Sequence, residues 1–281
     1  MTSKNNVAFF NGEFTTLDKV TISPFDRGFL FGDSIYEVTP VYNGKMLAFE
    51  RHTSRLIDGL NSIGIESPYT IQEWASIAKK ILIEDEACQL VYVQVTRGNE
   101  NVRKHRFPIE ATPTVLMFSI PFTQPFDESF KGCDSHLIED LRWKRCDVKS
   151  TSLMGNVLAY YQLYQDGVAH DEALLVRDNH VVEAPSSNVF IEKNGVIYTP
   201  PVSNILPGIT RTLVIEQAIK LGYQVIEEAP SVEALKSADE VWVSNSMEEL
   251  KPIISVNREP IGKGVPGATW LSLFREFQRL K

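Results

Sequence analysis

Two closely spaced prolines near the middle of the chain limit the folds open to it. They lie in the stretch Pro121-Phe122-Thr123-Gln124-Pro125. Proline has a fixed φ angle and no backbone N–H, so two of them this close continue neither a helix nor the interior of a sheet. The chain has 281 residues and is 43% hydrophobic, which suits two domains that each bury a core. We therefore predict an N-terminal α/β domain over residues 1–120, a linker over 121–125 and a C-terminal domain over 126–281.

Hydrophobic periodicity predicts a mixture of strands and helices in the first half. Asn-Gly pairs favour tight two-residue hairpin turns. Apolar residues at intervals of three and four favour helices, and Thr70 with Glu73 three positions later is typical of a helix start. The elements expected are hairpins across Asn11-Gly12 (strands 7–10 and 13–14) and Asn43-Gly44 (strands 35–41 and 45–49), helices over 50–63 and 71–82, and strands over 90–96 and 114–120.

The second half alternates strands and helices, without an internal repeat. The elements expected are a strand over 136–139, a helix over 153–165, hairpins over 172–182 and 189–199, a helix over 210–221 closed by Gly222, strands over 224–226 and 240–244, and a helix over 267–279. The fold class predicted for the whole chain is mixed, α+β or α/β, with two domains.

Composition excludes several classes of function. The net charge is −8 and there is no long basic run, which argues against nucleic acid or an anionic membrane as a partner. Met1 to Asn6 are polar, and no stretch of about 18 apolar residues occurs. The three cysteines, Cys88, Cys133 and Cys146, lack Cys-x-x-Cys spacing, so neither a disulfide framework nor a zinc site is expected. We expect a soluble, cytoplasmic protein without a bound metal.

Lys149 is the first candidate for chemistry. An isolated lysine is usually a solvated surface group, but this one follows a strongly polar run over 142–147 and precedes a helix rich in small and apolar residues. A lysine in a desolvated, cation-rich pocket has a lowered pKa, so its neutral amine can attack a carbonyl. That is the requirement for a Schiff base with an aldehyde cofactor.

Two later blocks complete the pattern expected of a pyridoxal phosphate enzyme. Glu183 closes a predicted strand, and a carboxylate against the ring nitrogen of the cofactor makes the ring a better electron sink. Gly208-Ile209-Thr210 begins a helix after Pro207, where backbone N–H groups and the helix dipole favour phosphate. Arg55 on the first helix could add a fixed positive charge for the same phosphate. Singly, these residues also fit a loop acid, a helix cap and an exposed helix arginine.

A basic segment supplies a candidate for carboxylate binding. Arg103 and His105 lie two positions apart, so in an extended segment both side chains point the same way. A guanidinium can make a forked contact with a carboxylate. A basic surface loop is the alternative explanation.

Taken together, these blocks resemble the fold-type IV pyridoxal phosphate enzymes of the class IV aminotransferase family, over nearly the whole chain. That family includes branched-chain aminotransferases, D-amino acid aminotransferases and aminodeoxychorismate lyases, and the D-amino acid enzymes look most similar. The stretches that carry the resemblance are Phe31-Gly32-Asp33-Ser34-Ile35-Tyr36-Glu37-Val38, Val91 to Gly98, Arg142 to Ser150, and Ser187-Asn188-Val189-Phe190.

The resemblance implies a role for each candidate residue. Lys149 would form the Schiff base with pyridoxal phosphate and move the substrate proton. Glu183 would pair with the pyridine nitrogen. Arg55 and the backbone of Ile209 and Thr210 would hold the phosphate. The substrate carboxylate would be bound by Tyr36, Arg103 and His105. The resemblance also implies an active site between two domains that a neighbouring subunit completes, hence a homodimer.

Two stretches depart from the family pattern. Ala184-Pro185-Ser186 stands where members usually have Gly-Ser-Ser after the glutamate, and Pro185 removes a backbone donor. Ser186 remains an expected cofactor contact. Ser244-Asn245-Ser246-Met247 replaces a threonine-rich stretch that donates to the phosphate, and Ser246 is the expected donor there.

The function predicted is amino transfer from a D-amino acid to a 2-oxo acid. Three enzymatic alternatives share the fold: an (R)-selective amine transaminase, a branched-chain L-amino acid transaminase and an aminodeoxychorismate lyase. A cofactor-free binding or scaffolding protein is an alternative of another class. An absorption band near roughly 400–430 nm, the region of a lysine-bound cofactor, would exclude that last alternative.

Overall fold

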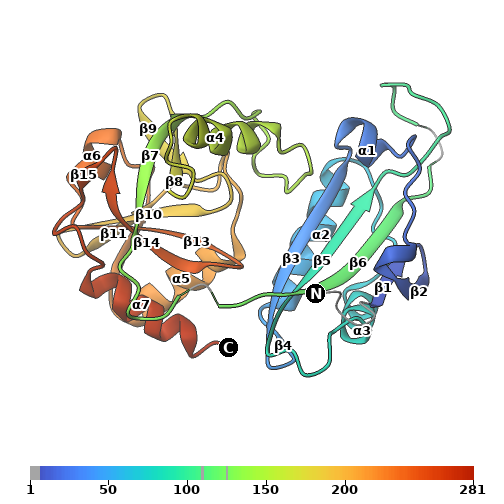
Figure 1. Ribbon diagram of the computed structural model, residues 1–281, viewed down its shortest axis with the longest axis horizontal. Coiled ribbons are helices and arrows are strands. Elements are labelled where there is room, and N and C mark those ends of the chain that lie inside the picture. The colour runs from blue at the N-terminus through green and yellow to red at the C-terminus, as the bar shows by residue number, and fades with distance from the viewer. Residues whose placement is uncertain (1–6, 109–110, 125) are drawn as a thin grey trace. The chain divides into compact units, whose positions relative to one another are not determined.

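The computed structural model describes residues 7–108, 111–124 and 126–281, and the chain divides into two compact units (Figure 1). The first unit comprises Met1–Thr123 with Val148–Ser152, and the second comprises Gln124–Asp147 with Leu153–Lys281. The boundary after Thr123 falls inside the predicted linker over 121–125. Pro125 of that linker and the polar start over residues 1–6 lie outside the described residues.

The segment Val148–Ser152 belongs to the first unit although it lies in the second half of the sequence. The sequence had placed Lys149 in the C-terminal domain, so the structure differs here. The physical reason is main-chain pairing, because the N–H of Tyr36 donates to the carbonyl of Lys149 at 3.0 Å. Val148 is also buried in the hydrophobic core of the first unit.

The first unit is built on a six-stranded sheet in which every pairing is antiparallel. The strand order is β2-β1-β6-β5-β3-β4. Its elements are β1 (Val7–Phe10), β2 (Glu13–Thr16), a 3-10 helix (Leu17–Lys19), α1 (Arg27–Phe31), β3 (Ser34–Tyr42), β4 (Lys45–Met46), α2 (Phe49–Ser62), α3 (Ile71–Lys80), β5 (Cys88–Thr96) and β6 (Thr114–Pro121).

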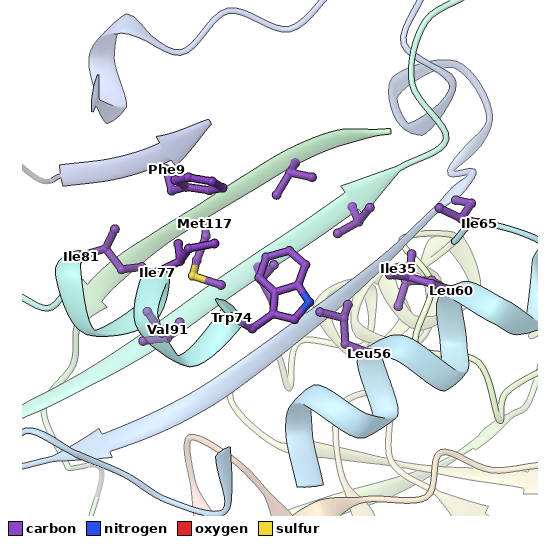
Figure 2. Packing of buried hydrophobic residues seen from close by; sticks show 14 of the residues in the cluster. Phe9, Ile35, Leu56, Leu60, Ile65, Trp74, Ile77, Ile81, Val91 and Met117 are labelled. Atoms are coloured by element: carbon purple, nitrogen blue, oxygen red, sulfur yellow. The ribbon is translucent and has the colours of Figure 1, made fainter. Parts of the chain in front are cut away.

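The core of this unit lies where α2 and α3 cover the sheet. Figure 2 shows Leu56 and Leu60 of α2 and Trp74 of α3 directed toward the strands, among side chains that include Ile35 and Met117. All five side chains are at most 2% exposed. The spacing of four between the two leucines places them on one helix face, as the sequence predicted.

The helix starts of the first unit follow local signals. At α3, Thr70 Oγ1 accepts from the N–H of Glu73 and the Glu73 carboxylate accepts from the N–H of Thr70, so the predicted capping pair is confirmed. The second strand of the second hairpin was predicted to reach Phe49. It ends at Met46 instead, because Ala48 adopts a φ of 51° and turns the chain into α2.

The second unit contains a nine-stranded mixed sheet with the order β12-β11-β10-β13-β14-β7-β8-β9, to which β15 adds at β14. Its elements are β7 (Cys133–Glu139), α4 (Met154–Gln165), β8 (Glu172–Arg177), β9 (His180–Glu183), β10 (Asn188–Lys193), β11 (Val196–Thr199), α5 (Ile209–Lys220), β12 (Gln224–Glu227), α6 (Val232–Lys236), β13 (Glu240–Asn245), β14 (Glu249–Val256), β15 (Glu259–Pro260) and α7 (Ala268–Gln278). No helix within the described residues is both long and apolar enough to cross a bilayer.

Candidate functional site

The amine of Lys149 lies over the ring of Tyr36, with Nζ 4.2 Å from the ring centroid. Both residues are held by the backbone, since the segment that carries Lys149 bonds along the edge of β3. Besides the Tyr36 to Lys149 bond, Ile35 forms a bridge with Ser150. Strand pairing therefore fixes the backbone of Lys149, and the side-chain rotamer then determines where the amine lies.

Side chains on the same strands reinforce this pairing. Ser34 Oγ lies 2.5 Å from Thr151 Oγ1, and Gln94 Nε2 donates to Ser34 Oγ at 3.2 Å. Tyr92 stacks on Tyr36 with ring centroids 5.9 Å apart and donates its hydroxyl to Gln94 Oε1. Burial raises the pKa of Tyr92 to about 12, so this hydroxyl keeps its proton at neutral pH.

Arg55 is fixed by a buried carboxylate. Its Nε lies 2.6 Å from Glu37 Oε1 and its Nη2 lies 3.0 Å from Glu37 Oε2, a forked ion pair. Glu37 also lies 2.9 Å from His52 Nδ1. Glu37 and His52 are almost fully buried. The arginine predicted to hold phosphate thus presents a guanidinium whose orientation is already determined.

The charges of this group follow from burial and pairing. Burial favours the neutral form of Glu37, but Arg55 and His52 outweigh it and lower the pKa of Glu37 to about 2. Burial lowers the pKa of His52, because it disfavours the charged imidazolium. This effect exceeds the attraction of Glu37, which would raise the pKa. At neutral pH His52 is therefore uncharged, and its Nδ1–H donates to the carboxylate. Neither Glu37 nor His52 is predicted from the sequence as a site residue. The sequence signal that could have indicated Glu37 is its position on the same face of the predicted strand as the apolar residues Ile35 and Val41.

Arg103 and His105 lie together in the segment that connects β5 to β6. Both are exposed, and both contact the ring of Phe31, the last residue of α1. The Arg103 guanidinium carbon is 5.4 Å from the ring centroid, and the His105 ring meets Phe31 edge-on at 5.3 Å. Neither side chain forms a hydrogen bond or ion pair with another described residue. Their polar atoms are therefore available to a ligand.

In the second unit, Glu183 ends β9 as a buried acid with three donors. Arg142 Nη1 lies 2.6 Å from Oε1, while Asn188 Nδ2 and the N–H of Leu206 reach Oε2 at 3.3 and 3.2 Å. Arg142 is held in turn by Asp140 at 2.9 Å. Burial raises the pKa of Glu183 to about 7, against the pull of Arg142. A cationic group beside this carboxylate would restore its charged form.

The start of α5 is an uncapped helix terminus next to this acid. Gly208 is the N-cap residue, and no side chain among the described residues caps the helix. The N–H groups of Ile209 and Thr210 lie in the first turn, where an α-helix leaves its donors unpaired. A Cβ at Gly208 would lie 1.9 Å from Asn188 Oδ1, so any other residue here would force this side chain to shift. The same asparagine therefore bonds Glu183 and packs against the helix start.

The two predicted serines lie on neighbouring turns. Ser186 is exposed and its Oγ lies 2.9 Å from the hydroxyl of Tyr160. Ser246 is half-buried in a turn that Asn245 closes by accepting from the N–H of Met247 and Glu248. Asn245 Nδ2 also donates to Ser187 Oγ at 2.8 Å, which joins the two turns.

Pro185 lies in the first of these turns, where its carbonyl accepts a hydrogen bond from Asn156 Nδ2 at 2.5 Å. The N–H of Ala184 donates to the carbonyl of Ser187. One hydroxyl nearby is uncommitted: Ser244 Oγ is buried and has no hydrogen-bond partner among the residues described. Ser244 is not among the donors predicted from the sequence.

The structure thus brings Lys149 to Tyr36, Arg55 to Glu37, and Arg103 to His105 within the first unit. In the second unit it brings Glu183 to the start of α5 and the turn of Ser186 to the turn of Ser246. An amine, a buried acid, an uncapped helix start and an orphan hydroxyl are groups that fit a phosphorylated aldehyde with a ring nitrogen. Within the described ranges, no three His, Cys, Asp or Glu side chains gather to hold a metal.

Residues 34–256 match the family described as Amino-transferase class IV. That span covers most of the chain, including β3, the Lys149 segment, Glu183 and the start of α5. The chain belongs to the class IV aminotransferases. It is therefore an aminotransferase of a family that uses pyridoxal phosphate.

Relatives of known name agree with this assignment. The chain is 38% identical over 278 residues to the D-alanine aminotransferase of Staphylococcus aureus strain N315, covering 96% of each sequence. Among solved structures, the branched-chain amino acid aminotransferase of Escherichia coli superposes with a TM-score of 0.89 at 22% identity, covering 99% of this chain and 95% of that one.

A third relative was crystallised with a cofactor derivative. The branched-chain amino acid aminotransferase of T.th., complexed with N-(5'-phosphopyridoxyl)-L-glutamate, superposes with a TM-score of 0.89 at 23% identity, covering 98% and 94% of the two chains. The two structural likenesses establish the fold of this class IV aminotransferase. The mixed fold, α+β or α/β with two domains, that the sequence predicted is confirmed, and the structure shows that it contains two sheets.

Proposed function

We propose that this class IV aminotransferase moves the amino group of a D-amino acid to a 2-oxo acid, as from D-alanine to 2-oxoglutarate to give pyruvate and D-glutamate. The observation that carries the proposal is the 38% identity, over 96% of both chains, to a protein named D-alanine aminotransferase. The branched-chain enzymes of similar fold share only 22% and 23% of residues with this chain.

The resemblance to the family implies which residues would hold pyridoxal phosphate. Lys149 would supply the amine for its aldehyde, and Glu183 the carboxylate for its ring nitrogen. Arg55 and the N–H groups of Ile209 and Thr210 would bind its phosphate. Ser186 and Ser246 are further candidate donors. When bound, the cofactor stabilises the electrons left at the substrate Cα and carries the amino group to the acceptor.

The residues of the chain then have distinct tasks. Lys149 Nζ would accept the proton from the substrate Cα and deliver it to C4′, the aldehyde carbon of the cofactor, which requires an amine placed close to both carbons. Strand pairing along β3 supports this placement, and the Tyr36 ring below Nζ limits where the amine can move. Glu183 remains a hydrogen-bond acceptor for the ring, with Arg142 and Asn188 fixing its orientation.

Substrate selection is assigned to Tyr36, Arg103 and His105, which would bind the α-carboxylate. A guanidinium with free N–H groups suits a carboxylate, and an imidazole beside it can donate a second hydrogen bond. The exposure of both side chains, and their lack of partners among the described residues, support this assignment.

The deciding experiment compares D-alanine with L-leucine as amino donors, at saturating 2-oxoglutarate and cofactor. We expect turnover of D-alanine and little of L-leucine, with the glutamate formed from 2-oxoglutarate measured chromatographically for both donors. A preference for L-leucine would move the enzyme to the branched-chain group. Release of p-aminobenzoate from 4-amino-4-deoxychorismate would make it a lyase instead.

We also propose that the enzyme is a homodimer, as the resemblance to its family implies, and that it is cytoplasmic. The chain has a mass of 31.7 kDa, so a dimer has twice that mass in light scattering after size-exclusion chromatography. A monomer with full activity would refute the dimer as the functional unit. Cell fractionation tests the location.

A further inference from the structure

The segment that carries Arg103 and His105 leaves β5 through a tightly constrained turn. Gly98 has a φ of +95°, and a Cβ on it would lie 1.9 Å from the carbonyl oxygen of Thr112. Its own carbonyl accepts from the N–H of Arg27 at 2.9 Å, so the segment starts against the first residue of α1. The direction in which the segment leaves β5 is therefore fixed.

Arg27 also holds the middle of the segment. Its side chain is buried, and Nη1 donates to the carbonyl of Lys104 at 2.7 Å. Lys104 separates Arg103 from His105, and the planar peptide that it forms with His105 is restrained by this bond. The Arg27 guanidinium carbon lies 4.9 Å from the Phe31 ring centroid, so one ring contacts Arg27, Arg103 and His105.

Arg97 holds the far part of the same segment. Its guanidinium carbon lies 4.2 Å from the ring centroid of Phe107. Its N–H groups donate to the carbonyls of Ile63 at 2.6 Å and Gly64 at 3.1 Å, just past the end of α2. Phe107 itself lies close to Gly64, where a Cβ would be 3.2 Å from the ring. Arg97 thus ties Phe107 to the C-terminal end of α2.

Asp33 joins the two arginines. Oδ2 lies 2.9 Å from Arg27 Nε and 2.8 Å from Arg97 Nε, and Oδ1 accepts from Arg97 Nη2 at 2.9 Å. Main-chain bonds add to this, since the N–H of Arg97 donates to the carbonyl of Asp33. Although burial opposes it, the hydrogen bonds from Arg97 and Arg27 lower the pKa of Asp33, so the carboxylate stays charged. The charged Asp33 therefore allows the guanidinium groups of Arg27 and Arg97 to lie close together beside the segment that carries Arg103 and His105.

We propose that Arg27, Asp33 and Arg97 are positioning residues for substrate selection: they anchor the 98–108 segment so that Arg103 and His105 meet the substrate carboxylate in a fixed arrangement. The inference rests on the proposed function, which assigns the carboxylate to Arg103 and His105. Arg27 and Arg97 do not themselves bind substrate. Their guanidinium groups are occupied by Asp33 and by backbone carbonyls.

Proteolysis tests the anchor without relying on activity. Trypsin cleaves after Arg103, Lys104 and Arg106, and cleavage requires local opening of the chain. Arg27→Met should accelerate cleavage at these three sites about tenfold or more, the effect of losing a hydrogen bond from a charged donor. The control is Arg275→Met, which breaks an exposed ion pair with Glu128 and should leave cleavage of the segment unchanged.

Kinetics test the consequence for substrate. Arg27→Met should raise the KM for D-alanine about tenfold while kcat stays within about twofold, because uniform binding of the carboxylate is weakened. Arg27→Met combined with Arg103→Met should have the KM of Arg103→Met alone, because the anchor acts through that side chain. A decrease in kcat at unchanged KM, or multiplied effects in the double variant, would overturn the proposal.

A second variant covers the case in which Arg27→Met fails to fold. Phe107→Leu removes the ring that Arg97 holds, at a side chain that is 64% exposed, and should shift both cleavage and KM in the same direction. Cleavage of this variant at the wild-type rate refutes the anchor. If Arg103→Met leaves the KM for D-alanine unchanged, the carboxylate assignment itself fails, and the inference fails with it whatever the cleavage rates.

Discussion

The Nζ atom of Lys149 lies 4.2 Å from the centroid of the Tyr36 ring, and the backbones of the same two residues share a hydrogen bond. The first contact places the amine nitrogen over an aromatic face. The second fixes the strand that carries the amine. Backbone pairing between segments distant in the sequence thus positions the amine of Lys149. The Tyr36 ring on the same sheet restricts its movement.

Replacing Lys149 by arginine should abolish amino transfer. The guanidinium retains a positive charge but can neither bond an aldehyde nor accept a proton, so activity should fall by at least about 10²–10⁴-fold. Borohydride reduction of the wild-type holoenzyme, followed by peptide mapping, should label the peptide that contains residue 149 and no other. Lys144→Arg, at an exposed lysine of the same run, should leave label and activity intact. A label on another residue would refute the assignment of Lys149.

Glu37→Gln should change how the protein responds to acid. The folded-state pKa of Glu37 is about 2 against an ordinary 4.5, so its ionisation stabilises the fold above pH 4.5 and that contribution is lost between pH 4.5 and 2. The variant should be less stable at pH 7 by about 3–5 kcal/mol, since Arg55 loses its partner carboxylate. Its stability should also vary less between pH 4.5 and 2. Urea unfolding at a series of pH values measures both effects. Equal pH dependence in the two proteins would contradict the prediction.

Local signals in the sequence predicted much of the fold. The Thr70 and Glu73 capping pair, the Asn-Gly turns and the helical spacing of Leu56 and Leu60 act over a few residues, and each appears in the structure as expected. Helices α1 and α6 were missed, because five residues are too few to show a periodicity. Strand β14 was not predicted either. It contains Pro252, which lacks the N–H that a strand donates.

Local sequence signals predicted less of the candidate site. Lys149 and Glu183 were singled out by their context and by a family resemblance. The pairing of the Lys149 segment with β3 depends on contacts more than a hundred residues apart, which no local pattern reports. The burial of Glu37 with His52 was missed for a related reason. A glutamate in a strand is ordinarily solvent-facing, and only the packed structure shows Arg55 and His52 satisfying it.

Glu183→Gln should impair catalysis while preserving the fold. The amide keeps the shape of the side chain but offers the cofactor ring no negative charge, so kcat should fall roughly 10–100-fold, the loss of a charged hydrogen bond. Cofactor should also dissociate more readily, which equilibrium dialysis of the holoenzyme measures. Glu228→Gln, at an exposed glutamate of the same unit, is the matched control. Wild-type kcat and cofactor retention in Glu183→Gln would exclude a role for this acid at the ring.

Gly208→Ala should disturb the start of α5 and the acid beside it together. The new Cβ would lie 1.9 Å from Asn188 Oδ1, so Asn188 must give up its contacts with Glu183 or with the carbonyl of Leu206. Overpacking of this kind costs about 1–3 kcal/mol of stability. Cofactor affinity should fall as well, because the N–H groups of the first turn shift with the backbone.

A double-variant cycle separates this clash from a general intolerance of alanine at the helix start. Asn188→Ala removes the amide that the new Cβ would meet, so in its presence Gly208→Ala should cost less stability than it does alone. Urea unfolding of the four cofactor-free proteins gives the coupling energy, and titration with pyridoxal phosphate gives the affinities. Additive effects on stability would mean that Gly208 is required for a reason other than the close approach of Asn188.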